Sequence, residues 1–426
     1  MTYSEAIQYL QSLQVFGARF GLETPRKLAE LSGQPQDKLR FIHVAGTNGK
    51  GSVCAMLESI YRAAGLKVGL YTSPHLVSFR ERVQINRQLI SEADVAKHTC
   101  ELLELARRLP QDQPVTFFEF VTLMALRHFA EQKCDLVIWE TGLGGRLDAT
   151  NIVKPLASVI TNIGHDHQQW LGNTLAEIAF EKAGIIKRGV PVITGTDQPE
   201  ALAVITETAQ RKDAPLTLVR PADAVASFPS NWKPPLLGEH QKANAALAAA
   251  TVHAIHSQLP VPAGALKLGL ETVWWPGRLQ LVTSVDGRLW LLDGAHNLEG
   301  VETLHQTLKQ DFANEPKTLI VGMLADKDWQ GMVQRLAPLF DEIHAVPVAS
   351  NRSLSPAQLA EALGAANPAA CVFTHESASQ CLTGLASTPF TVVTGSLYLI
   401  GEVMERLGIS TSPAESERGL NEWTTR

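Results

Sequence analysis

The first half of the chain alternates short apolar runs with longer stretches in which apolar residues recur every three or four positions. Short apolar runs bounded by turn residues are typical of buried strands, whereas the longer spacing is typical of helices. The pattern predicts helices over residues 2–14, 24–31, 52–64, 91–108, 117–132, 174–183 and 199–211, and strands over 41–45, 67–71, 135–139, 157–161 and 190–194. This alternation favours an α/β fold with a mainly parallel sheet covered by helices on both faces.

A second α/β pattern follows a break in the sequence. Pro-rich residues 221–235 interrupt the first pattern, an alanine-rich helix is predicted over residues 240–257, and the string WWPGR at Trp274–Arg278 breaks the periodicity again. Strands are then predicted over 289–293, 317–322, 342–346, 371–374 and 390–394. At 426 residues the chain is long enough for two cores, so we predict two domains, residues 1–281 and 282–426. The last ~15 residues, rich in Ser, Thr and Glu, are predicted to form a frayed tail.

Composition excludes several classes of protein. Hydrophobic residues make up 45% and charged residues 19%, which is ordinary for a globular protein, and no 18-residue apolar run predicts a membrane span. The N-terminus lacks a signal-peptide core, so we expect a cytoplasmic protein. The five cysteines form no C-x-x-C pair, which argues against a disulfide framework and a thiolate zinc site. A net charge of −6 without a basic cluster argues against a nucleic-acid partner.

One loop has the composition of a phosphate-binding loop. The string GTNGKGS at Gly46–Ser52 follows the apolar run 41–45 and opens a helical pattern. Glycines let backbone N–H groups face an anion, the helix N-terminus adds positive partial charge, Lys50 can reach phosphates, and Ser52 offers a hydroxyl to Mg²⁺. The spacing departs from G-x-x-x-x-G-K-[ST], because the first glycine is Gly46 and the hydroxyl comes one residue late. The alternative is a Gly-rich turn that binds nothing.

Polar residues also follow three further apolar runs. Ser73 follows residues 67–71, Glu140 follows 135–139, and His165 and His167 follow 157–161. Strand ends of a parallel sheet gather at one edge, so the hydroxyl, carboxylate and imidazole together favour Mg²⁺ beside the phosphates. Other interpretations stay open. Ser73 can serve only the turn before proline, and Glu140 can pair with Arg146. His165 and His167 can be zinc ligands of a hydrolase, although no third ligand at a suitable spacing accompanies them.

Several long strings of residues carry a resemblance to a known family. They are His43–Ser52 (HVAGTNGKGS), Thr72–Leu76 (TSPHL) with Glu81 and Arg82 following, Glu140–Asn151 (ETGLGGRLDATN), Glu181–Lys187 (EKAGIIK), Gly238–Asn244 (GEHQKAN), Trp275–Arg278 (WPGR), Asp293–Asn297 (DGAHN) and Thr394–Ser396 (TGS). On these strings the chain resembles the dihydrofolate synthase/folylpolyglutamate synthase family of Mur-type ATP-dependent ligases. The resemblance spans both predicted domains and excludes only the tail.

The resemblance implies a fold and a reaction. The expected fold is an N-terminal P-loop ATPase domain that also binds the pterin, followed by a smaller, Rossmann-like C-terminal glutamate-ligase domain. The expected reaction begins when a substrate carboxylate attacks the γ-phosphate of ATP and forms an acyl phosphate. The amine of L-glutamate then displaces phosphate through a tetrahedral intermediate. Catalysis of the phosphoryl transfer is expected to rest mostly on positioning and charge neutralisation.

The resemblance also implies roles for single residues. Metal ligands are implied for Ser73, Glu140, His167 and Lys182, the last as an N-carboxylated (carbamylated) side chain that holds a second Mg²⁺. Catalytic roles are implied for Lys50, Lys182, His167 and Glu140. ATP contacts are implied for Asn48, Gly49, Lys50, Gly51, Ser52, Asn244, Arg278, Asp293 and His296, with Asn244 against the adenine. Dihydropteroate contacts are implied for Thr116, Phe117, Phe118, Glu119, Leu147, Asp148 and Ala149.

Some of these residues have ordinary alternatives. On sequence alone, Lys182 is typical of a solvated helix face, and at least one of Phe117 and Phe118 is typical of a core position. Trp275–Arg278 reads equally as a hinge and Asp293 as a turn residue. His165 stands where many family members carry an apolar residue, so the resemblance assigns it no role.

The expected function is therefore that of a monomeric, ATP- and Mg²⁺-dependent ligase that adds L-glutamate to 7,8-dihydropteroate and to tetrahydrofolates. Its partners are expected to be small molecules, without nucleic acid or membrane. A folylpolyglutamate synthase without the dihydropteroate activity is the nearest alternative. A P-loop phosphotransferase or simple NTPase, and a nucleotide-binding module without catalysis, are more distant alternatives.

Overall fold

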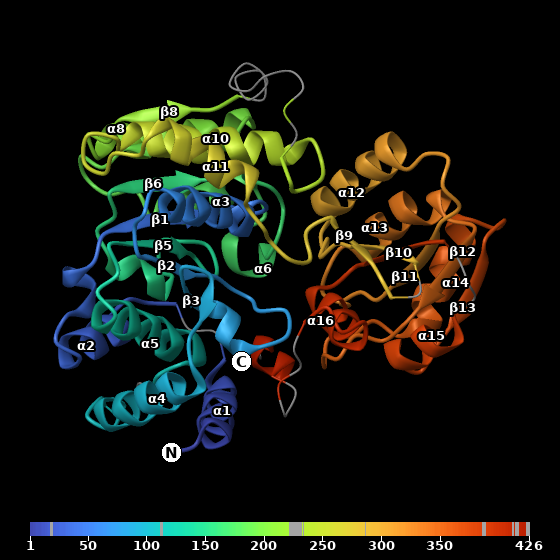
Figure 1. Ribbon diagram of the computed structural model, residues 1–426, viewed down its shortest axis with the longest axis horizontal. Helices are drawn as coiled ribbons and strands as arrows, with labels where there is room; N and C mark the ends of the chain where they lie inside the picture. Colours follow the sequence, from blue (N-terminus) through green and yellow to red (C-terminus); the bar gives the residue numbers. More distant parts are fainter. Residues whose placement is uncertain are drawn as a thin grey trace.

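The protein folds into two α/β lobes that lie side by side (Figure 1). The computed structural model describes residues 1–17, 20–110, 114–220, 232, 234–285, 287–385, 389–410, 413 and 417–422. We call the part from α1 (Tyr3–Ser12) to α11 (Ala263–Glu271) the N-terminal lobe, and the part from β9 (Gln280–Thr283) to α16 (Leu397–Arg406) the C-terminal lobe. Most of the Pro-rich stretch 221–235 lies outside the described residues.

An eight-stranded sheet forms the centre of the N-terminal lobe. Its order is β4 (Gln88–Leu89), β3 (Val83–Ile85), β2 (Val68–Tyr71), β5 (Leu136–Glu140), β1 (Phe41–Ala45), β6 (Ala157–Ile160), β7 (Val192–Thr194) and β8 (Leu216–Leu218). Six neighbouring strands, β2, β5, β1, β6, β7 and β8, are parallel to one another. Strands β3 and β4 form an antiparallel hairpin at the edge next to β2. The parallel strands bring the residues after β1, β2, β5 and β6 to one edge.

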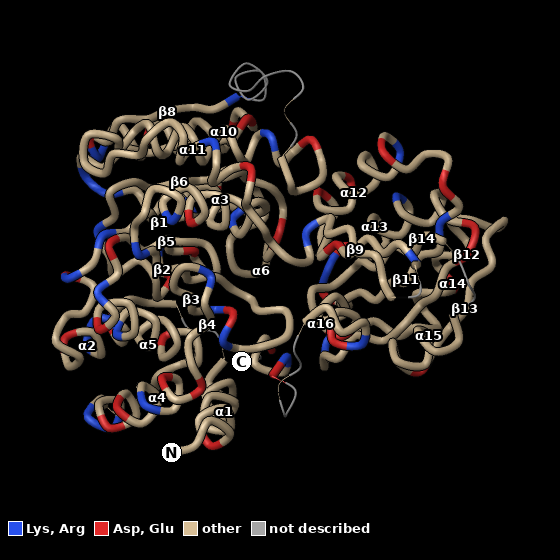
Figure 2. Tube along the Cα trace, viewed as in Figure 1, with Lys and Arg blue, Asp and Glu red and all other residues tan. Residues whose placement is uncertain are grey.

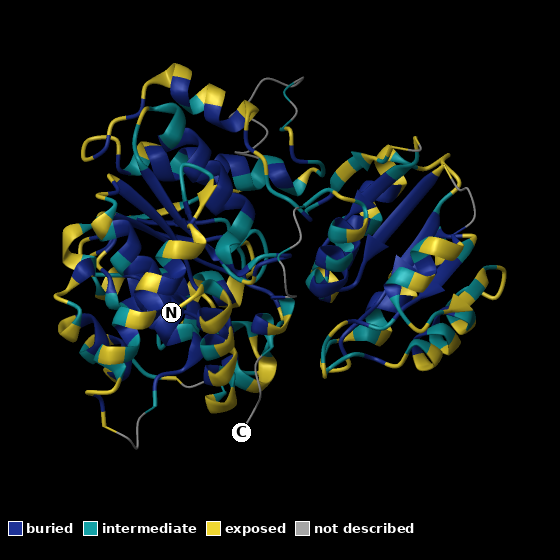
Figure 3. Ribbon diagram, turned by 60° about the horizontal axis from the view of Figure 1, so that its bottom comes forward, coloured by how far each residue is buried: buried dark blue, intermediate teal, exposed yellow. Residues whose placement is uncertain are grey.

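Helices cover both faces of this sheet. They are α1, α2 (Glu23–Leu31), α3 (Lys50–Ala63), α4 (Glu92–Ala106), α5 (Phe117–Glu131), α6 (Gln168–Leu171), α7 (Leu175–Ala183), α8 (Pro199–Arg211), α10 (His240–Ala254) and α11. The strands read as apolar runs because both of their faces are buried: Trp139 on β5 is fully buried and its ring lies 4.4 Å from that of Tyr71 on β2. Figure 3 shows the buried strands enclosed by helices with exposed outer faces.

The C-terminal lobe has a smaller sheet of six strands. Its order is β13 (Cys371–Thr374), β12 (Glu342–Ala345), β11 (Thr318–Val321), β14 (Phe390–Thr394), β10 (Leu289–Leu292) and β9, and only β9 is antiparallel to its neighbour. Its helices are α12 (Leu298–Asp311), α13 (Trp329–Leu336), α14 (Pro356–Ala366), α15 (Ala378–Gly384) and α16. Figure 2 shows acidic and basic residues interspersed on both lobes. Among the described residues, no helix is both long and apolar enough to span a bilayer.

The predicted α/β class is confirmed, with corrections at several elements. Helix α3 begins at Lys50 rather than residue 52, and α1 ends at Ser12, where a 3-10 turn takes over. Four short strands were not predicted, β3, β4, β8 and β9. Because β9 begins at Gln280, the second sheet starts two residues before the predicted boundary, and the division into residues 1–281 and 282–426 stays a prediction.

The prediction of a frayed tail is wrong for residues 417–422. These residues return to the N-terminal lobe, where Glu417 and Leu420 are buried and the 3-10 turn Arg418–Asn421 contacts α1. The carboxylate of Glu417 accepts hydrogen bonds from the hydroxyl of Tyr3 (2.7 Å) and the backbone N–H of Phe79 (2.6 Å). The polar composition of the tail predicts exposure to solvent. A carboxylate that accepts several hydrogen bonds can nevertheless be buried.

Candidate active site

The phosphate-type loop lies between β1 and α3, as the sequence predicted. Gly49 is the N-cap of α3 with φ +80°, a conformation that favours glycine, and it has no side chain to bond the first N–H groups of the helix. A Cβ atom there would lie 2.7 Å from Oδ1 of Asn244 on α10. The Nζ atom of Lys50 donates hydrogen bonds to the carbonyl oxygens of Gly46 and Thr47, each at 3.0 Å. The loop therefore presents a helix N-terminus and a lysine at one place, which suits an anion.

A second lysine reaches the same carbonyl oxygen. Lys182, near the end of α7, is buried, and its Nζ donates to the carbonyl of Gly46 at 2.7 Å. Burial, together with a smaller contribution from the neighbouring charge of Lys50, lowers the pKa of Lys182 to about 7. A neutral amine is therefore abundant at Lys182 near neutral pH, which a lysine on a solvated helix face would not provide.

A carboxylate and an imidazole lie at the ends of β5 and β6. Glu140 is buried, and its Oε2 accepts a hydrogen bond from the backbone N–H of Ser73 at 3.0 Å. Burial raises the pKa of Glu140, the charge of Lys50 lowers it by a smaller amount, and the resulting pKa is about 6. Burial lowers the pKa of His167 to about 3, so its ring is neutral at pH 7. A buried carboxylate, a serine at the turn after β2 and a neutral imidazole form a donor set that fits a divalent cation.

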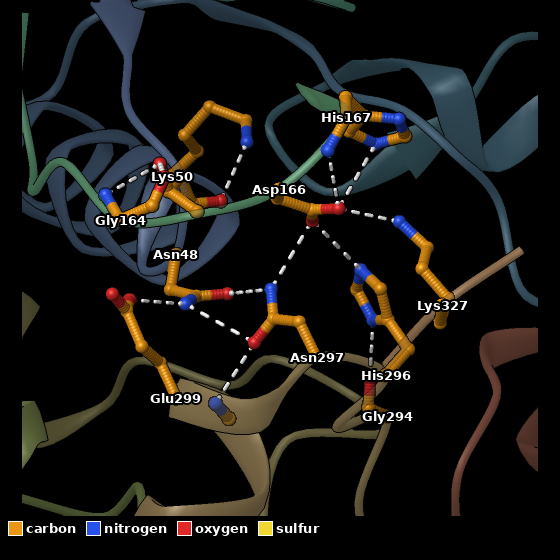
Figure 4. A network of polar contacts seen from close by, with 12 residues as sticks. Asn48, Lys50, Gly164, Asp166, His167, Gly294, His296, Asn297, Glu299 and Lys327 are labelled. Atoms are coloured by element: carbon orange, nitrogen blue, oxygen red, sulfur yellow. Dashed lines mark hydrogen bonds and ion pairs between the residues drawn. The ribbon is translucent and has the colours of Figure 1, made fainter. Parts of the chain in front are cut away.

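Asp166 joins the two lobes (Figure 4). Its carboxylate accepts hydrogen bonds from Nζ of Lys327 at 2.5 Å and from Nδ2 of Asn297 at 3.1 Å, and Nε2 of His296 lies 3.9 Å away. Burial opposes ionisation of Asp166, but His167, Lys327 and His296 around it hold its pKa well below the usual value. Asp166 is therefore a fixed anion to which three residues of the C-terminal lobe are attached.

The phosphate loop itself also contacts the C-terminal lobe. The side-chain amide of Asn48 donates to Oε2 of Glu299 at 3.1 Å and to Oδ1 of Asn297 at 3.4 Å, while its Oδ1 accepts from Nδ2 of Asn297 at 3.1 Å (Figure 4). Asn297 is the N-cap of α12, where its Oδ1 accepts from the N–H of Gly300. The start of α12 therefore lies directly against the loop.

Arg278 and Asp293 lie at the junction of the lobes. Nη1 of Arg278 donates to the carbonyl of Gly294 at 3.2 Å, and the Asp293 carboxylate accepts from the N–H groups of Leu279 (2.8 Å) and Ala295 (3.0 Å). Burial lowers the pKa of Arg278 and raises that of Asp293, and each charge favours ionisation of the other. Asp293 therefore fixes the turn that follows β10, as well as facing the cavity.

The expected pterin residues come from two helix starts. Thr116 and Glu119 form a reciprocal cap at the N-terminus of α5, and Asp148 caps the short 3-10 helix Ala149–Ile152. The Asp148 carboxylate accepts from the N–H groups of Leu143 at 2.8 Å and Thr150 at 3.0 Å, so it also holds the glycine-rich turn after β5. Phe117 is buried in the core and Phe118 packs against Gly142.

One cavity of about 390 Å³ brings these groups together between the lobes. Its wall contains every predicted site residue except Asn244, which lies behind Gly49 and donates to Gln241. The predicted members of the wall are Asn48, Gly49, Lys50, Gly51, Ser52, Ser73, Thr116, Phe117, Phe118, Glu119, Glu140, Leu147, Asp148, Ala149, His167, Lys182, Arg278, Asp293 and His296. A phosphate-type loop, a candidate metal site and an apolar region therefore share one space.

Known proteins share this arrangement and sequence. The Mur ligase middle domain matches residues 44–252, and the Mur ligase glutamate ligase domain matches residues 277–397. The dihydrofolate synthase/folylpolyglutamate synthase of Bacillus subtilis is 38% identical over 428 residues, which cover 95% of this chain and 99% of that protein.

The chain belongs to the dihydrofolate synthase/folylpolyglutamate synthase family.

Solved structures agree with this assignment. The E. coli FolC structure in complex with DHPP and ADP is 33% identical, has a TM-score of 0.84, and the match covers 96% of this chain and 98% of that one. A bifunctional folylpolyglutamate synthase/dihydrofolate synthase with Mn, AMPPNP and L-glutamate bound is 34% identical with a TM-score of 0.80, and the match covers 96% and 98%. The protein is thus a Mur-family, ATP-dependent ligase.

The zinc-hydrolase interpretation finds no support in this ligase. His165 is exposed, interacts through Nδ1 with Nε2 of Gln168 at 3.3 Å, and does not line the cavity, whereas His167 does. The two histidines are not in one candidate metal group among the described residues. Arg146 binds Glu181 at 2.8 Å, so it is engaged elsewhere than at Glu140.

Sequence reasoning missed the residues that connect the lobes of this ligase. Asp166 was passed over beside His167, and Asn297, Glu299 and Lys327 were not singled out, although Lys327 follows the predicted strand 317–322. Site residues gather after the carboxyl ends of parallel strands, and the same search in the second sheet would have indicated Lys327. Residues 420–422 of the supposed tail also line the cavity, and no sequence signal pointed to them.

Proposed function

We propose that this ligase is bifunctional and adds L-glutamate both to 7,8-dihydropteroate and to the γ-carboxylate of tetrahydrofolates. The observation that carries the proposal is the single cavity that connects the Lys50 loop with the segments 116–119 and 147–149. The two substrates carry their reacting carboxylates at different distances from the pterin. Because one cavity extends from the phosphate loop into an apolar region, we propose that either carboxylate reaches the same reacting phosphate. Both lobes of one chain contribute proposed site residues, and we propose that the enzyme acts as a monomer.

Phosphate binding is proposed for Asn48 to Ser52. An ATP phosphate is a stronger acceptor than a carbonyl, so we expect the Lys50 ammonium to leave Gly46 and Thr47 and to bind the β- and γ-phosphates. Arg278, Asp293 and His296 are proposed to contact the nucleotide from the junction of the lobes. Asn244 is proposed as the adenine contact, because an amide offers a donor and an acceptor together.

Ser73, Glu140 and His167 are proposed to hold one Mg²⁺. The fit rests on the buried Glu140 carboxylate and on the neutral His167 ring. When bound, the ions neutralise the charge that develops on the transferred phosphoryl group. A second Mg²⁺ is proposed to be held by Lys182 in its carbamylated form.

Carbamylation of Lys182 is supported by the crowding of two ammonium groups on the Gly46 carbonyl. The neutral amine of Lys182 attacks the carbon of CO₂, an N–C bond forms, and one amine proton passes to solvent. The product is an anion, so the repulsion between the two lysines becomes an attraction. The lowered pKa supplies the neutral amine that this step requires.

The ligation then proceeds in two displacements. A carboxylate oxygen of the pterin substrate attacks the γ-phosphorus while the bond to the ADP oxygen breaks, and Lys50 stabilises the departing negative charge. The amine of L-glutamate attacks the acyl carbon, phosphate leaves, and the amine loses a proton. The Asp166 network holds the C-terminal lobe against the loop during both steps, which keeps water from the acyl phosphate.

The test is ADP release measured side by side with dihydropteroate and with tetrahydrofolate, each with and without L-glutamate. Release that requires glutamate with both pterins is expected. Turnover of tetrahydrofolate alone would make the protein a folylpolyglutamate synthase only. Release without glutamate or pterin would indicate a simple NTPase, and no release at all would indicate a binding module.

A further inference from the structure

A cluster of two histidines and a cysteine lies in the C-terminal lobe, apart from the ligase site. His344 is on β12, His375 directly follows β13, and Cys381 is on α15. One ligand atom from each lies within 4.8 Å of the others. None of the three lines the cavity between the lobes, and Figure 1 shows β12, β13 and α15 on the side of this lobe that faces away from the N-terminal lobe.

A carboxylate orients the first histidine. Nε2 of His344 lies 2.8 Å from Oε1 of Glu342, two residues earlier on the same strand. A carboxylate only accepts, so Nε2 carries the proton and Nδ1 of the neutral ring carries the lone pair. That Nδ1 points to Nε2 of His375, 2.9 Å away. A carboxylate that binds the far nitrogen of a histidine is the arrangement that orients metal-ligating histidines in proteins.

The third member supplies a sulfur atom. Cys381 is fully buried, and burial next to Glu342 raises the pKa of its thiol to about 12. An imidazole pair with one thiolate is a donor set for Zn²⁺, whereas the oxygen-rich ligase site suits Mg²⁺. Tetrahedral Zn²⁺ with bonds of about 2.0–2.3 Å places its ligand atoms roughly 3.3–3.7 Å apart. The present upper limit of 4.8 Å between the three ligand atoms exceeds these separations by about 1 Å, which is the adjustment that binding requires.

We propose that His344, His375 and Cys381 form a Zn²⁺ site, with water as the fourth ligand and Glu342 as a positioning residue. His375 is half-buried and gives solvent access to the ion. The site connects the edge strand β13 and its neighbour β12 to α15, so we expect it to stabilise this part of the lobe. The ordinary alternative is a hydrogen-bonded histidine pair beside a core cysteine.

Cobalt titration of the full chain in excess Mg²⁺ tests the ligand set. We expect one equivalent of Co²⁺ to produce a thiolate-to-cobalt charge-transfer band in the near ultraviolet, which Zn²⁺ then abolishes by displacement. Cys381→Ser should remove the band, while the matched control Cys371→Ser, an exposed cysteine on β13, should retain it. The other candidate metal group of the described residues, Asp94, His98 and His128, has no thiol and cannot produce this band.

Further readouts guard against a variant that misfolds. Zn²⁺ should raise the Tm of the wild type and of Cys371→Ser but not of His375→Ala, whose half-exposed side chain is replaced without opening the core. Zn²⁺ binding at pH 8 should release about one proton per ion from the thiol. Glu342→Gln should keep the band but lower Zn²⁺ affinity roughly 10- to 100-fold. Absence of the band, its survival in Cys381→Ser, or an equal Zn²⁺ affinity of His375→Ala would overturn the site, and an unchanged affinity of Glu342→Gln would overturn its positioning role.

Discussion

The two walls of the ligase cavity are built on different principles. The N-terminal wall carries groups whose protonation is shifted by burial, namely Glu140, His167 and Lys182, around a loop fixed between a strand and a helix. The C-terminal lobe contributes Lys327, which lines the cavity, and Asn297, which does not; they bind Asp166 and Asn48 of the other lobe. We infer from this difference that the first wall serves the phosphoryl chemistry, and that Lys327 and Asn297 hold the lobes in register beside the proposed nucleotide contacts Asp293 and His296. Substitutions in the two walls should therefore fail in different ways.

The largest effect is expected at the loop. Lys50→Ala should abolish turnover because it removes the cation from the γ-phosphate, while its Tm stays close to that of the wild type. Steady-state ADP release measures the first quantity and thermal unfolding the second. The control is Lys267→Ala, an exposed lysine on α11. If the variant retained more than about a tenth of the wild-type kcat, Lys50 would contribute less than ~1.4 kcal/mol to stabilisation of the transition state. That contribution would be too small for a side chain that binds the γ-phosphate.

Lys182 tests the chemistry of the same wall. Lys182→Ala should be inactive and should regain part of its activity in acetate, because a free carboxylate occupies the position of the carbamate. Lys182→Arg should be inactive without rescue, since a guanidinium fills the space and does not react with CO₂. Carbon-13 NMR of the wild type in labelled bicarbonate should show one carbamate signal that both variants lack. Full activity in the alanine variant would disprove the modification.

Lys327 tests the second wall. Lys327→Met leaves the buried Asp166 without its closest cation, so docking of the lobes should weaken. We expect kcat/KM for L-glutamate to fall by about tenfold or more, an effect of ~1.4 kcal/mol, with a smaller change in ATP affinity. Lys309→Met, at an exposed position on α12, is the matched control. If ATP affinity instead fell as much as kcat/KM for glutamate, Lys327 would belong to the nucleotide site.

Asp148 sharpens the comparison within the first wall. Asp148→Ala should lower kcat/KM for dihydropteroate by at least about tenfold and spare tetrahydrofolate more, because the pterin ring lies further from the phosphate loop in the second reaction. The measurement is kcat/KM for both substrates at saturating ATP and glutamate. Equal losses would assign Asp148 to the turn alone, through its bonds to Leu143 and Thr150.

The smallest effect is expected from pH. Glu140 must lose a proton to bind a cation, and Lys182 must lose one to react with CO₂, so activity should rise with pH through the range set by their pKa values of about 6 and about 7. A pH profile of kcat/KM checks this. More Mg²⁺ competes with the proton on Glu140 and should move the lower limb to more acidic pH. More bicarbonate should raise activity only in the part of the pH profile that depends on Lys182. A flat profile between pH 5.5 and 7.5 would contradict both assignments.

The sequence predicted the first wall better than the second for a physical reason. Gly46–Ser52 and Glu140 stand directly after apolar runs, and strands that are buried on both faces leave a strong local pattern. Helix α3 begins at Lys50 rather than 52 because the left-handed Gly49 caps it, which a periodicity of apolar residues does not record. The C-terminal lobe is held against the first wall by contacts such as Asn48 to Asn297, between residues 249 positions apart. No local pattern encodes such a distance.

The burial of Glu417 and Leu420 against the N-terminal lobe has a mechanical consequence. The chain enters the C-terminal lobe after Trp275 and returns to the N-terminal lobe by Glu417, so covalent connections join the two lobes at both places. A body attached at two points turns most easily about the line that joins them, because that rotation stretches neither connection. The connectivity of the backbone thereby favours one axis for a relative rotation of the lobes, which passes near residues 275 and 417.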